Sequence, residues 1–524
     1  MVGRPKSPCE ALIPQFYAGR SVFITGATGL MGKVLIERLL STCPDIGKLH
    51  LLVRPKKEVL PEKRLQGLKD SMAFANLRQQ RPVQLEKLCI IPGDVSLPGY
   101  GLSPESLQQL KEVSIIFHSA ATVKFDEPLP AAVEMNIKSV IRLMDICDTL
   151  PKLETLVHVS TAYSNPERYV VEERVYEPPT SVDKLFSVVE CLPQPILDTV
   201  TSKFISPKPN TYTYTKAMAE VVVNTRPKRH YSVAIFRPTI VISAKQHPFP
   251  GWIDNLNGPS GVIVASGKGL LHVFLRSPDV VADLLPVDIA IDTMIAVAWE
   301  TTVDKLPEAR VYNCSTYENP TCWDQMERNL RRNFPITPLD DALWFPSAFC
   351  VSNTYLYMLL VFLLQTLPLT LAEYVTRIFG MKMKFNLVMV EQKIRNMTEV
   401  LSFFSMREWQ FRTDNVCKLR DRLTLSDKAI YNLDPKSINW DEQYASFVLG
   451  VRKYILKEKD EKLPESRRHL NRLYYLHKCV TVFFIAVAVR LIMQNHWIRT
   501  IASDVARVTF LVIFSFISQF VELS

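Results

Sequence analysis

The stretch Ser21-Val-Phe-Ile-Thr-Gly-Ala-Thr-Gly-Leu-Met-Gly32 decides the fold. It begins as an apolar run of strand length and ends in a turn with three glycines, and the helical pattern Lys33-Val-Leu-Ile-Glu-Arg-Leu-Leu40 follows directly. A strand, a glycine-rich turn and a helix in this order are typical of a βαβ unit that binds a dinucleotide. The turn and the helix N-terminus are expected to hold the pyrophosphate, and the last glycine to allow close packing of helix on strand. The predicted cofactor-binding positions here are Gly26, Thr28, Gly29 and Gly32.

Further strand-like runs alternate with helical segments up to about residue 330. They are Lys48–Val53, the start of Cys89–Val95, Ser114–His118, Thr155–Val159, Val233–Arg237 and Val311–Cys314. This alternation predicts an α/β fold, a Rossmann-type doubly wound parallel sheet with crossover helices. Ligands collect at the carboxyl ends of such strands, so the residues that follow each strand are candidates for the site.

The second strand predicts which dinucleotide is bound. It runs into Arg54-Pro-Lys-Lys57, and no acid appears before Glu58. A chain that binds NAD usually places a carboxylate here for the ribose hydroxyls, whereas the guanidinium of Arg54 suits a 2′-phosphate. The sequence therefore predicts NADPH, with a solvated basic turn as the alternative interpretation.

Two later strand ends add cofactor candidates. Asp94, followed by Val95, is a candidate to meet the adenine amino group, because it repeats the pattern of a strand followed by Asp. The small residues of Ser119-Ala-Ala-Thr122, with Ala120 among them, are expected to leave room for the cofactor.

The run Asn210-Thr-Tyr-Thr-Tyr-Thr-Lys216 supplies the candidate catalytic pair, Tyr212 and Lys216. Residues four apart share a face of a helix. The Lys216 ammonium is predicted to hold a ribose hydroxyl and to lower the pKa of the Tyr212 phenol from its usual ~10, so that Tyr212 exchanges a proton with a carbonyl oxygen. These residues predict carbonyl reduction by hydride transfer.

A third group is expected beside this oxygen. Ser160-Thr-Ala-Tyr-Ser164 follows a predicted strand, and the hydroxyl of Thr161 or Ser160 would bond the substrate oxygen. The sequence leaves both open, with Thr161 preferred for its position relative to Ala162. Asn136 is a candidate for a proton relay, and a structural role is its alternative.

With these motifs in place, the chain resembles an extended short-chain dehydrogenase/reductase, and more narrowly a eukaryotic fatty acyl-CoA reductase. The blocks that carry the resemblance are His118–Phe125, His158–Tyr163, Pro209–Lys216, Pro248–Asn255, Gly258–Gly261, Gly267–Gly269 and Ala282–Asp288. The likeness covers nearly the whole chain, and the C-terminal third looks like a male-sterility-type domain. Leu30-Met31 stands where the family commonly has Phe-Leu, a conservative apolar change.

The resemblance implies reduction of a long-chain fatty acyl-CoA by two NADPH, through an aldehyde, to a primary alcohol and CoA. Two other classes share part of the pattern. A sugar-nucleotide epimerase or a hydroxysteroid dehydrogenase would not be expected to carry Arg54 without an acid, the Pro248–Asn255 block or the helical C-terminal part. A non-enzymatic NADPH sensor has no need for Tyr212 and Lys216 together.

The 524 residues exceed one ordinary domain. We expect an NADPH-binding reductase domain over residues 1–330, with a substrate lobe at about 245–290, a helical domain over 331–465, and a basic stretch with a membrane-associating tail over 466–524. Trp252 is either a wall of the substrate lobe or core. The ten cysteines show no metal-ligand spacing, and the N-terminus lacks an apolar signal segment, so a reducing, cytosol-facing environment is expected.

The tail predicts a membrane as partner. Residues 451–478 carry nine Lys/Arg against four Asp/Glu, within a net charge of +9, and precede an apolar tail, which points to anionic lipid and not to nucleic acid. The apolar runs Cys479–Val489 and Val508–Ile517, separated by Arg490, Asp504 and Arg507, are each shorter than the ~20 residues of a straight span.

A tilted span, a re-entrant hairpin and interfacial helices all remain open, with soluble core helices as the alternative. The basic stretch predicts a catalytic domain that faces the cytosol. The resemblance implies a peroxisomal or endoplasmic-reticulum membrane, between which the sequence does not choose. The apolar stretch Leu356–Leu371 is predicted to be a buried helix, a membrane-contacting surface or part of an acyl channel.

Overall fold

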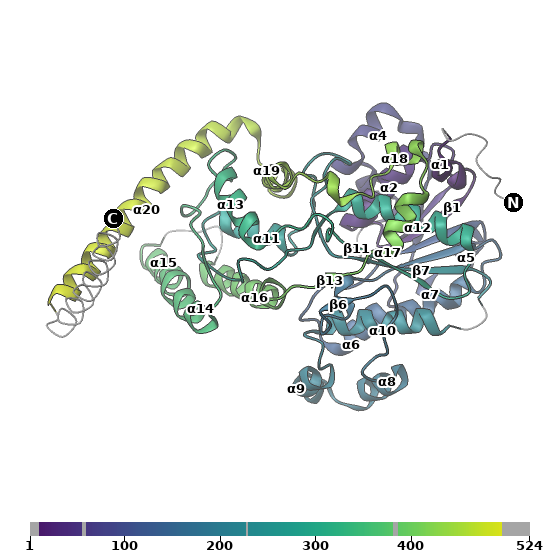
Figure 1. Cartoon of the computed structure of the whole chain (residues 1–524), viewed down its shortest axis with the longest axis horizontal. Coiled ribbons are helices and arrows are strands. Elements are labelled where there is room, and N and C mark those ends of the chain that lie inside the picture. Colours follow the sequence, from purple (N-terminus) through teal and green to yellow (C-terminus); the bar gives the residue numbers. More distant parts are fainter. Residues whose placement is uncertain (1–9, 55–58, 227–228, 381–385, 495–524) are drawn as a thin grey trace, which may run out of the picture.

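The computed structural model describes residues 10–54, 59–226, 229–380 and 386–494. Its centre is a seven-stranded sheet in the order β11-β7-β5-β4-β1-β2-β3, and each neighbouring pair is parallel (Figure 1). The strands are β1 (Ser21–Thr25), β2 (Leu49–Val53), β3 (Leu88–Pro92), β4 (Val113–His118), β5 (Thr155–Val159), β7 (Ser232–Pro238) and β11 (Arg310–Cys314). The predicted doubly wound parallel sheet is confirmed.

Helices cover both faces of this sheet, which explains why its strands read as continuous apolar runs. In β4, Ile115 and Phe117 pack with helices α2 (Leu30–Thr42) and α12 (Val287–Asp304) on one face. Ile116, between them, packs with α7 (Ser139–Cys147) and α10 (Thr211–Thr225) on the other. The other helices before residue 226 are α1 (Leu12–Tyr17), α3 (Pro61–Lys69), α4 (Ala75–Gln80), α5 (Pro104–Leu110), α6 (Leu129–Val133), α8 (Val182–Cys191) and α9 (Gln194–Phe204).

The strand order places the site. Strands β2 and β3 lie on one side of β1, and β4 lies on the other, so the order reverses between β1 and β4. In open α/β sheets ligands bind in the crevice at such a point, beyond the carboxyl ends of the strands. The glycine turn leaves β1 at this end.

The predicted substrate lobe contains α11 (Pro259–Gly267), β9 (Val273–Leu275) and β10 (Leu284–Pro286), which pairs with β8 (Ile240–Ile242). Trp252 is 1% exposed and belongs to the main core, so the second of its two interpretations holds. Helix α13 (Trp323–Asn333) follows β11. The strand β12 (Phe349–Val351) then pairs with β9 and leads into the C-terminal helices.

The C-terminal part is mainly helical, as expected, but it returns to pack on the first part of the chain and adds a strand to a separate two-stranded sheet. After α14 (Thr354–Val361), η6 (Phe362–Thr366), α15 (Leu367–Ile378) and α16 (Leu387–Ser405), strand β13 (Gln410–Phe411) pairs with β6 (Val170–Val171). Helices α17 (Asp414–Arg422), α18 (Leu425–Ile430) and α19 (Trp440–Gly450) follow. Side chains from this segment share one core cluster with α2 and α12, so the residues after 405 do not form a core of their own.

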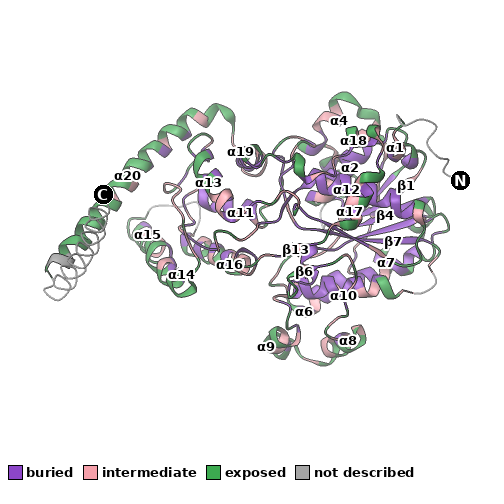
Figure 2. Ribbon diagram, viewed as in Figure 1, coloured by how far each residue is buried: buried purple, intermediate pink, exposed green. Residues whose placement is uncertain are grey.

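Two exposed apolar helices project at the end of the molecule away from the sheet (Figures 1 and 2). One is the segment 354–378, and the other is α20 (Leu463–Gln494), which contains the predicted run Cys479–Val489. Both are long and apolar enough to cross a membrane, and little of either is buried, which excludes the core-helix interpretation for them. The second run, Val508–Ile517, lies outside the described residues.

Candidate active site

The glycine turn forms a cradle of bare backbone between β1 and α2. Gly26 has a φ of +73°, and a Cβ atom on it would lie 2.8 Å from the carbonyl carbon of Ser119. A Cβ on Gly32 would overlap the carbonyl oxygen of Gly26 and the backbone of Ala27. Gly32 therefore lets α2 pack closely on the glycine turn itself. The sequence predicted close packing of the helix on the strand. Backbone amides and the N-terminus of α2 are left to face an anion, which fits a dinucleotide pyrophosphate.

The loop after β4 closes one side of this cradle. Ala120 donates its amide to the Thr25 hydroxyl at 3.2 Å, and that hydroxyl lies 2.8 Å from Nδ1 of His118. A Cβ on Gly26 would also lie 2.9 Å from the Ala120 nitrogen. The structure thus brings Ala120 and the glycine turn together.

Asp94 and Val95 follow β3 at the same edge of the sheet. One carboxylate oxygen of Asp94 accepts hydrogen bonds from the Ser96 amide at 3.0 Å and from its hydroxyl at 2.9 Å. This turn fixes the half-buried carboxylate beyond the strand end, while Val95 is buried. Contact of Asp94 with adenine stays a prediction.

Arg54 is exposed at the carboxyl end of β2. Within the described ranges, no carboxylate forms an ion pair with it, and its carbonyl oxygen accepts a hydrogen bond from the Arg64 guanidinium. Arg64 is a second cation at this edge that the sequence did not single out, since it lies on α3, beyond the predicted basic turn. Lys56, Lys57 and Glu58 of that turn lie outside the described residues.

Helix α10 carries the candidate catalytic pair. Asn210 caps the helix by accepting the Thr213 amide at 2.9 Å, which places Tyr212 in its first turn. Lys216, one turn later, is 4% exposed, and its Nζ donates to the carbonyl oxygen of Val159 at 2.8 Å. Burial lowers the pKa of Lys216 to about 8. The ammonium is thus held at the carboxyl end of β5.

Tyr212 is half-buried, and its ring packs edge-on against Phe125 with ring centres 5.5 Å apart. Burial raises the pKa of Tyr212 to about 12, although a hydrogen bond with Thr161 acts in the opposite direction. The prediction that Lys216 lowers this pKa is therefore wrong in the structure. The Lys216 ammonium donates its hydrogen bond to the Val159 carbonyl and not to the phenol. The largest effect on the pKa of Tyr212 is therefore the cost of burying the charged phenolate. Tyr212 stays protonated at neutral pH and is ready to donate.

The two hydroxyl candidates after β5 differ in their contacts. Thr161 bonds Tyr212 and accepts the amide of Tyr163 at 3.2 Å, so its side chain is fixed beside the phenol. The Ser160 hydroxyl is buried and has no hydrogen-bond partner within the part of the chain that the structure describes. The geometry supports Thr161 as the third group, and its catalytic role stays a prediction.

Asn136 lies in a π-helical turn, η4 (Glu134–Lys138), and both polar atoms of its side chain form hydrogen bonds. Its side-chain oxygen accepts the Thr122 amide at 3.0 Å, and its nitrogen donates to the Thr215 hydroxyl at 3.0 Å. Asn136 therefore ties the loop after β4 to α10 beside Lys216. This is the structural role that the sequence left as the alternative to a proton relay.

Two histidines that the sequence reasoning missed lie near Lys216. His118 and His158 occupy the ends of β4 and β5, and their rings stack with centres 5.5 Å apart. Burial lowers the pKa of His118 to about 3 and that of His158 below its usual value, and the charge of Lys216 acts in the same direction. Both imidazoles are neutral at physiological pH. Their positions at strand ends were the available signal.

The C-terminal part adds an aromatic wall, in a segment where the sequence showed no catalytic constellation. Phe404, at the end of α16, lies 5.4 Å from Phe125 and 5.2 Å from Tyr163, measured between ring centres. Trp409 lies 5.2 Å from Tyr163 and donates its indole N–H to the Pro166 carbonyl at 2.9 Å. These rings make the side of the site next to Tyr212 apolar. The cluster of aromatic residues at 403–411 was a signal, but its partners lie more than 200 residues earlier.

Known proteins share both the sequence and the fold. Residues 24–294 and 364–458 match two family profiles, each described as male sterility protein. Fatty acyl-CoA reductase 1 of Gallus gallus is 38% identical over 463 residues, or 88% of this chain and 89% of that protein. Fatty acyl-CoA reductase 2 of Bos taurus is 36% identical over 514 residues, 98% of both chains, and that of Homo sapiens is 35% identical over 97% of this chain and 98% of that protein.

Solved structures extend the likeness in fold. The terminal R domain from the myxalamid PKS-NRPS pathway superposes with a TM-score of 0.56 at 17% identity, over 83% of this chain and 91% of that one. A reductase domain of a nonribosomal peptide synthetase from Mycobacterium tuberculosis has a TM-score of 0.54 at 18% identity, over 86% and 93%. Identities this low concern the fold alone.

Proposed function

The chain belongs to the fatty acyl-CoA reductase family, and from this premise we propose that it reduces a long-chain fatty acyl-CoA to a primary alcohol. The thioester carbon gains a hydride, the C–S bond breaks with loss of CoA, and the resulting aldehyde gains a second hydride and a proton on its oxygen. The balance requires two molecules of NADPH for each acyl-CoA.

The observation that carries this proposal is the convergence of Tyr212, Thr161 and Lys216 at the carboxyl end of β5. Thr161 and Tyr212 bond the carbonyl oxygen, and the phenol of Tyr212 gives that oxygen its proton. Lys216 holds the ribose of the cofactor. Because burial raises the pKa of Tyr212 to about 12, the donor is fully protonated at neutral pH. The aromatic wall with Phe404 excludes water from this step.

NADPH is the cofactor that we propose. When bound, it supplies the hydride for both reductions. The cradle at Gly26, Gly29 and Gly32 fits its pyrophosphate, and the exposed guanidinium of Arg54 fits its 2′-phosphate. The choice of NADPH over NADH depends on Arg54.

We further propose that the protein is attached to a peroxisomal or endoplasmic-reticulum membrane through its C-terminal part, with the catalytic part facing the cytosol. The support is the exposed apolar surface of α20 and the basic residues at its start. The proposed substrate and product both partition into lipid, so such a location would bring the site to them.

One experiment tests the reaction. The purified full-length protein is incubated with acyl-CoAs of graded chain length and with NADPH or NADH, and the extracted products are identified by mass spectrometry. We expect a fatty alcohol from long chains, formed with NADPH in preference to NADH. A product that stops at the aldehyde would contradict the second reduction, and the absence of any reduced lipid would contradict the proposal itself.

A further inference from the structure

The segment 354–378, formed by α14, η6 and α15, exposes apolar side chains along its whole length. Its inner side carries the buried Tyr357 and Val361 and also Gln365, which is 1% exposed and accepts the His272 amide at 3.2 Å. We call the outward face the apolar ledge. Its exposed members are Tyr355, Leu356, Met358, Leu359, Phe362, Leu363, Leu364, Leu367, Leu371, Tyr374, Val375 and Ile378. Soluble proteins rarely expose an apolar patch of this kind without a partner.

Helix α16 runs back antiparallel along the entire ledge. Three contacts fix this direction: Tyr357 to Thr398 at 3.0 Å, Thr366 to Glu391 at 2.7 Å, and Glu373 to the Leu387 amide at 2.9 Å. The ledge and α16 are therefore one helical hairpin, and whatever depth the ledge reaches in a membrane, α16 follows it.

Charged side chains on α16 make it energetically unfavourable for the hairpin to cross a bilayer. Helix α16 exposes Gln392, Lys393, Asn396 and Glu399 along its outer side. In a spanning hairpin Lys393 and Glu399 would enter the hydrocarbon, and a charged side chain at the centre of a membrane helix costs ~2.5–3.5 kcal/mol or more. An amphipathic element that lies in the plane of the interface avoids this cost, because only its apolar face enters the lipid.

The ledge is connected to the other exposed apolar helix, α20, through one loop. On α20, His477 accepts a hydrogen bond from Trp344 at 3.0 Å, and Tyr474 packs on Phe345 with ring centres 5.1 Å apart. The same loop continues to Phe349, whose amide donates to the His272 carbonyl at 2.7 Å. His272 in turn donates to Gln365 beneath the ledge. The two apolar helices thus lie at the same end of the molecule and are connected through this loop (Figure 2).

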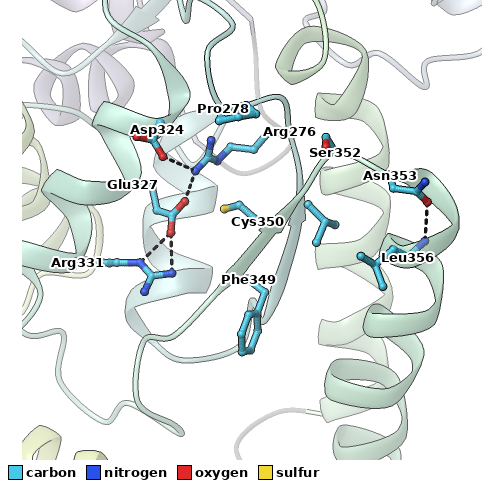
Figure 3. A pocket seen from close by; sticks show the side chains of 11 residues that line it. Arg276, Pro278, Asp324, Glu327, Arg331, Phe349, Cys350, Ser352, Asn353 and Leu356 are labelled. Carbon is cyan, nitrogen blue, oxygen red and sulfur yellow. Dashed lines mark hydrogen bonds and ion pairs between the residues drawn. The ribbon is translucent and has the colours of Figure 1, made fainter. Parts of the chain in front are cut away.

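At the base of the ledge, charged side chains of α13 and Arg276 lie across a cavity from the first leucine of the ledge (Figure 3). A cavity of about 550 Å³ has Arg276, Glu327 and Arg331 on one side and Leu356 of the ledge on the other. The charges pair with one another, and Asn353 caps α14 by accepting the Leu356 amide at 3.0 Å. A polar border of this kind suits the headgroup level of a bilayer.

The hairpin also leads to the candidate active site. The Ser405 hydroxyl, at the end of α16, donates to the Leu275 carbonyl at 2.6 Å, and the preceding Phe404 belongs to the aromatic wall beside Tyr212. Helix α16 therefore connects the ledge directly with the wall of the site.

We propose that the apolar ledge docks flat on a phospholipid bilayer, as a second membrane contact that does not span it, and that this contact delivers acyl chains from the lipid toward Tyr212. The docking stands on the geometry of the hairpin, and the delivery rests on the proposed function. The ledge orients the catalytic part, while α20 attaches it.

The docking is tested on the full-length protein in phosphatidylcholine vesicles. An environment-sensitive fluorescent amino acid is placed at Leu359 or Leu371 on the ledge, or at Asn396 on α16 as the matched control. We expect quenching by doxyl-labelled lipids at the two ledge positions and little at Asn396. Equal exposure to water at all three would overturn the proposal, and so would energy transfer between copies that shows the ledge buried in a dimer.

Spanning is distinguished with a quencher that does not cross membranes. Probes at Tyr355 and Ile378 mark the two ends of the segment. Added outside, the quencher is expected to reach both probes to the same extent. Protection of one end alone would mean that the segment spans the bilayer and would overturn the flat arrangement.

Delivery is tested by activity. The double variant Leu359→Gln/Leu371→Gln should lower turnover of long-chain acyl-CoA presented in vesicles by about tenfold while leaving turnover of a dissolved short-chain acyl-CoA unchanged. The matched control is Val83→Gln, a change at an exposed apolar residue far from the ledge. An unchanged rate on vesicles would overturn delivery. If the unaltered protein reduced no acyl-CoA at all, the proposed function would be contradicted. The quenching experiment would still test the docking of the ledge.

Discussion

The Nζ of Lys216 donates a 2.8 Å hydrogen bond to the carbonyl oxygen of Val159. This contact joins α10 to the carboxyl end of β5, 57 residues earlier in the chain. It fixes the ammonium next to the position where Tyr212 and Thr161 meet, because Thr161 follows Val159 by two residues. The catalytic candidates are thus held by the sheet and not by a flexible loop, which favours a preorganised site.

Changing Tyr212 to Phe should abolish proton donation and leave the ring packing on Phe125 intact. We expect turnover to fall by ~10²–10⁴-fold, the usual contribution of a positioned acid, while NADPH binding persists. Steady-state kinetics and cofactor titration measure the two effects. Tyr214→Phe is the matched control, because the Tyr214 hydroxyl is buried without a hydrogen-bond partner within the described residues. A Tyr212→Phe enzyme that keeps most of its rate would refute the assignment.

The rate should depend on pH through Lys216. Burial lowers its pKa to about 8, so the ammonium that holds the ribose is present below that pH and is lost as the pH rises through it. Tyr212, with a pKa of about 12, stays protonated over this range. We expect kcat/KM for NADPH to fall above pH of about 8. In Lys216→Arg this alkaline limb should disappear, because a guanidinium stays charged. A profile that stays flat to pH of about 10 in the unaltered enzyme would exclude Lys216 as the titrating group.

Removing the guanidinium of Arg54 should change the choice of cofactor. A charge-assisted contact with phosphate contributes ~1.5–3 kcal/mol, so Arg54→Ala should raise the KM for NADPH by roughly ten- to a hundredfold and leave that for NADH nearly unchanged. The control is Arg328→Ala, at an arginine exposed on α13. Equal effects of Arg54→Ala on both cofactors would show that this residue does not meet the 2′-phosphate.

The sequence predicted the structural elements and site residues that depend on residues close together in the chain. The run Ser21–Gly32 specifies strand, turn and helix within a dozen residues, and Asn210 to Lys216 specifies a helix with its cap and its catalytic face. It did not predict contacts between distant segments. Phe404 reaches Tyr163 across more than 200 residues, and the pKa of Tyr212 depends on burial that only the assembled site creates. The apolar run 356–371 was visible, but its outward orientation follows from α16 packing on its polar side.

A buried ion pair should hold the C-terminal part on the sheet. Arg38 and Asp292 lie 2.7 Å apart, and the same groups bond the Ile430 carbonyl and the Asn432 amide. Breaking a buried pair leaves an uncompensated charge, so Arg38→Ala should lower the free energy of unfolding by ~3–5 kcal/mol. Thermal and denaturant unfolding measure this loss.

The partly exposed pair of Arg20 and Glu154 provides the control for this prediction. Glu154→Gln should cost only ~0–1 kcal/mol, because exposed ion pairs contribute little. Similar losses in the two variants would mean that the Arg38 pair does not carry the docking of the C-terminal part.

Deletion of the tail should change the mode of membrane attachment. A deletion from residue 466 would remove the buried Leu470 and Leu473 and the contact of Arg467 with the Ile336 carbonyl at 2.7 Å, and so would disturb folding. The truncation is therefore made from Cys479 onward, which keeps these contacts. Without residues 479–524 the protein should become extractable from organelle membranes by carbonate, because the inserted apolar segment is gone. It should still bind vesicles reversibly through the apolar ledge and keep its activity on detergent-dispersed acyl-CoA.

Sedimentation with vesicles and carbonate extraction check this outcome against the full-length chain. A further variant combines the truncation with Leu359→Gln and Leu371→Gln, and it should lose vesicle binding altogether if α20 and the ledge are the two contacts. Resistance of the truncated protein to carbonate would place the attachment in the ledge itself. Failure of the truncated protein to bind vesicles at all would leave α20 as the membrane contact and refute the flat docking of segment 354–378.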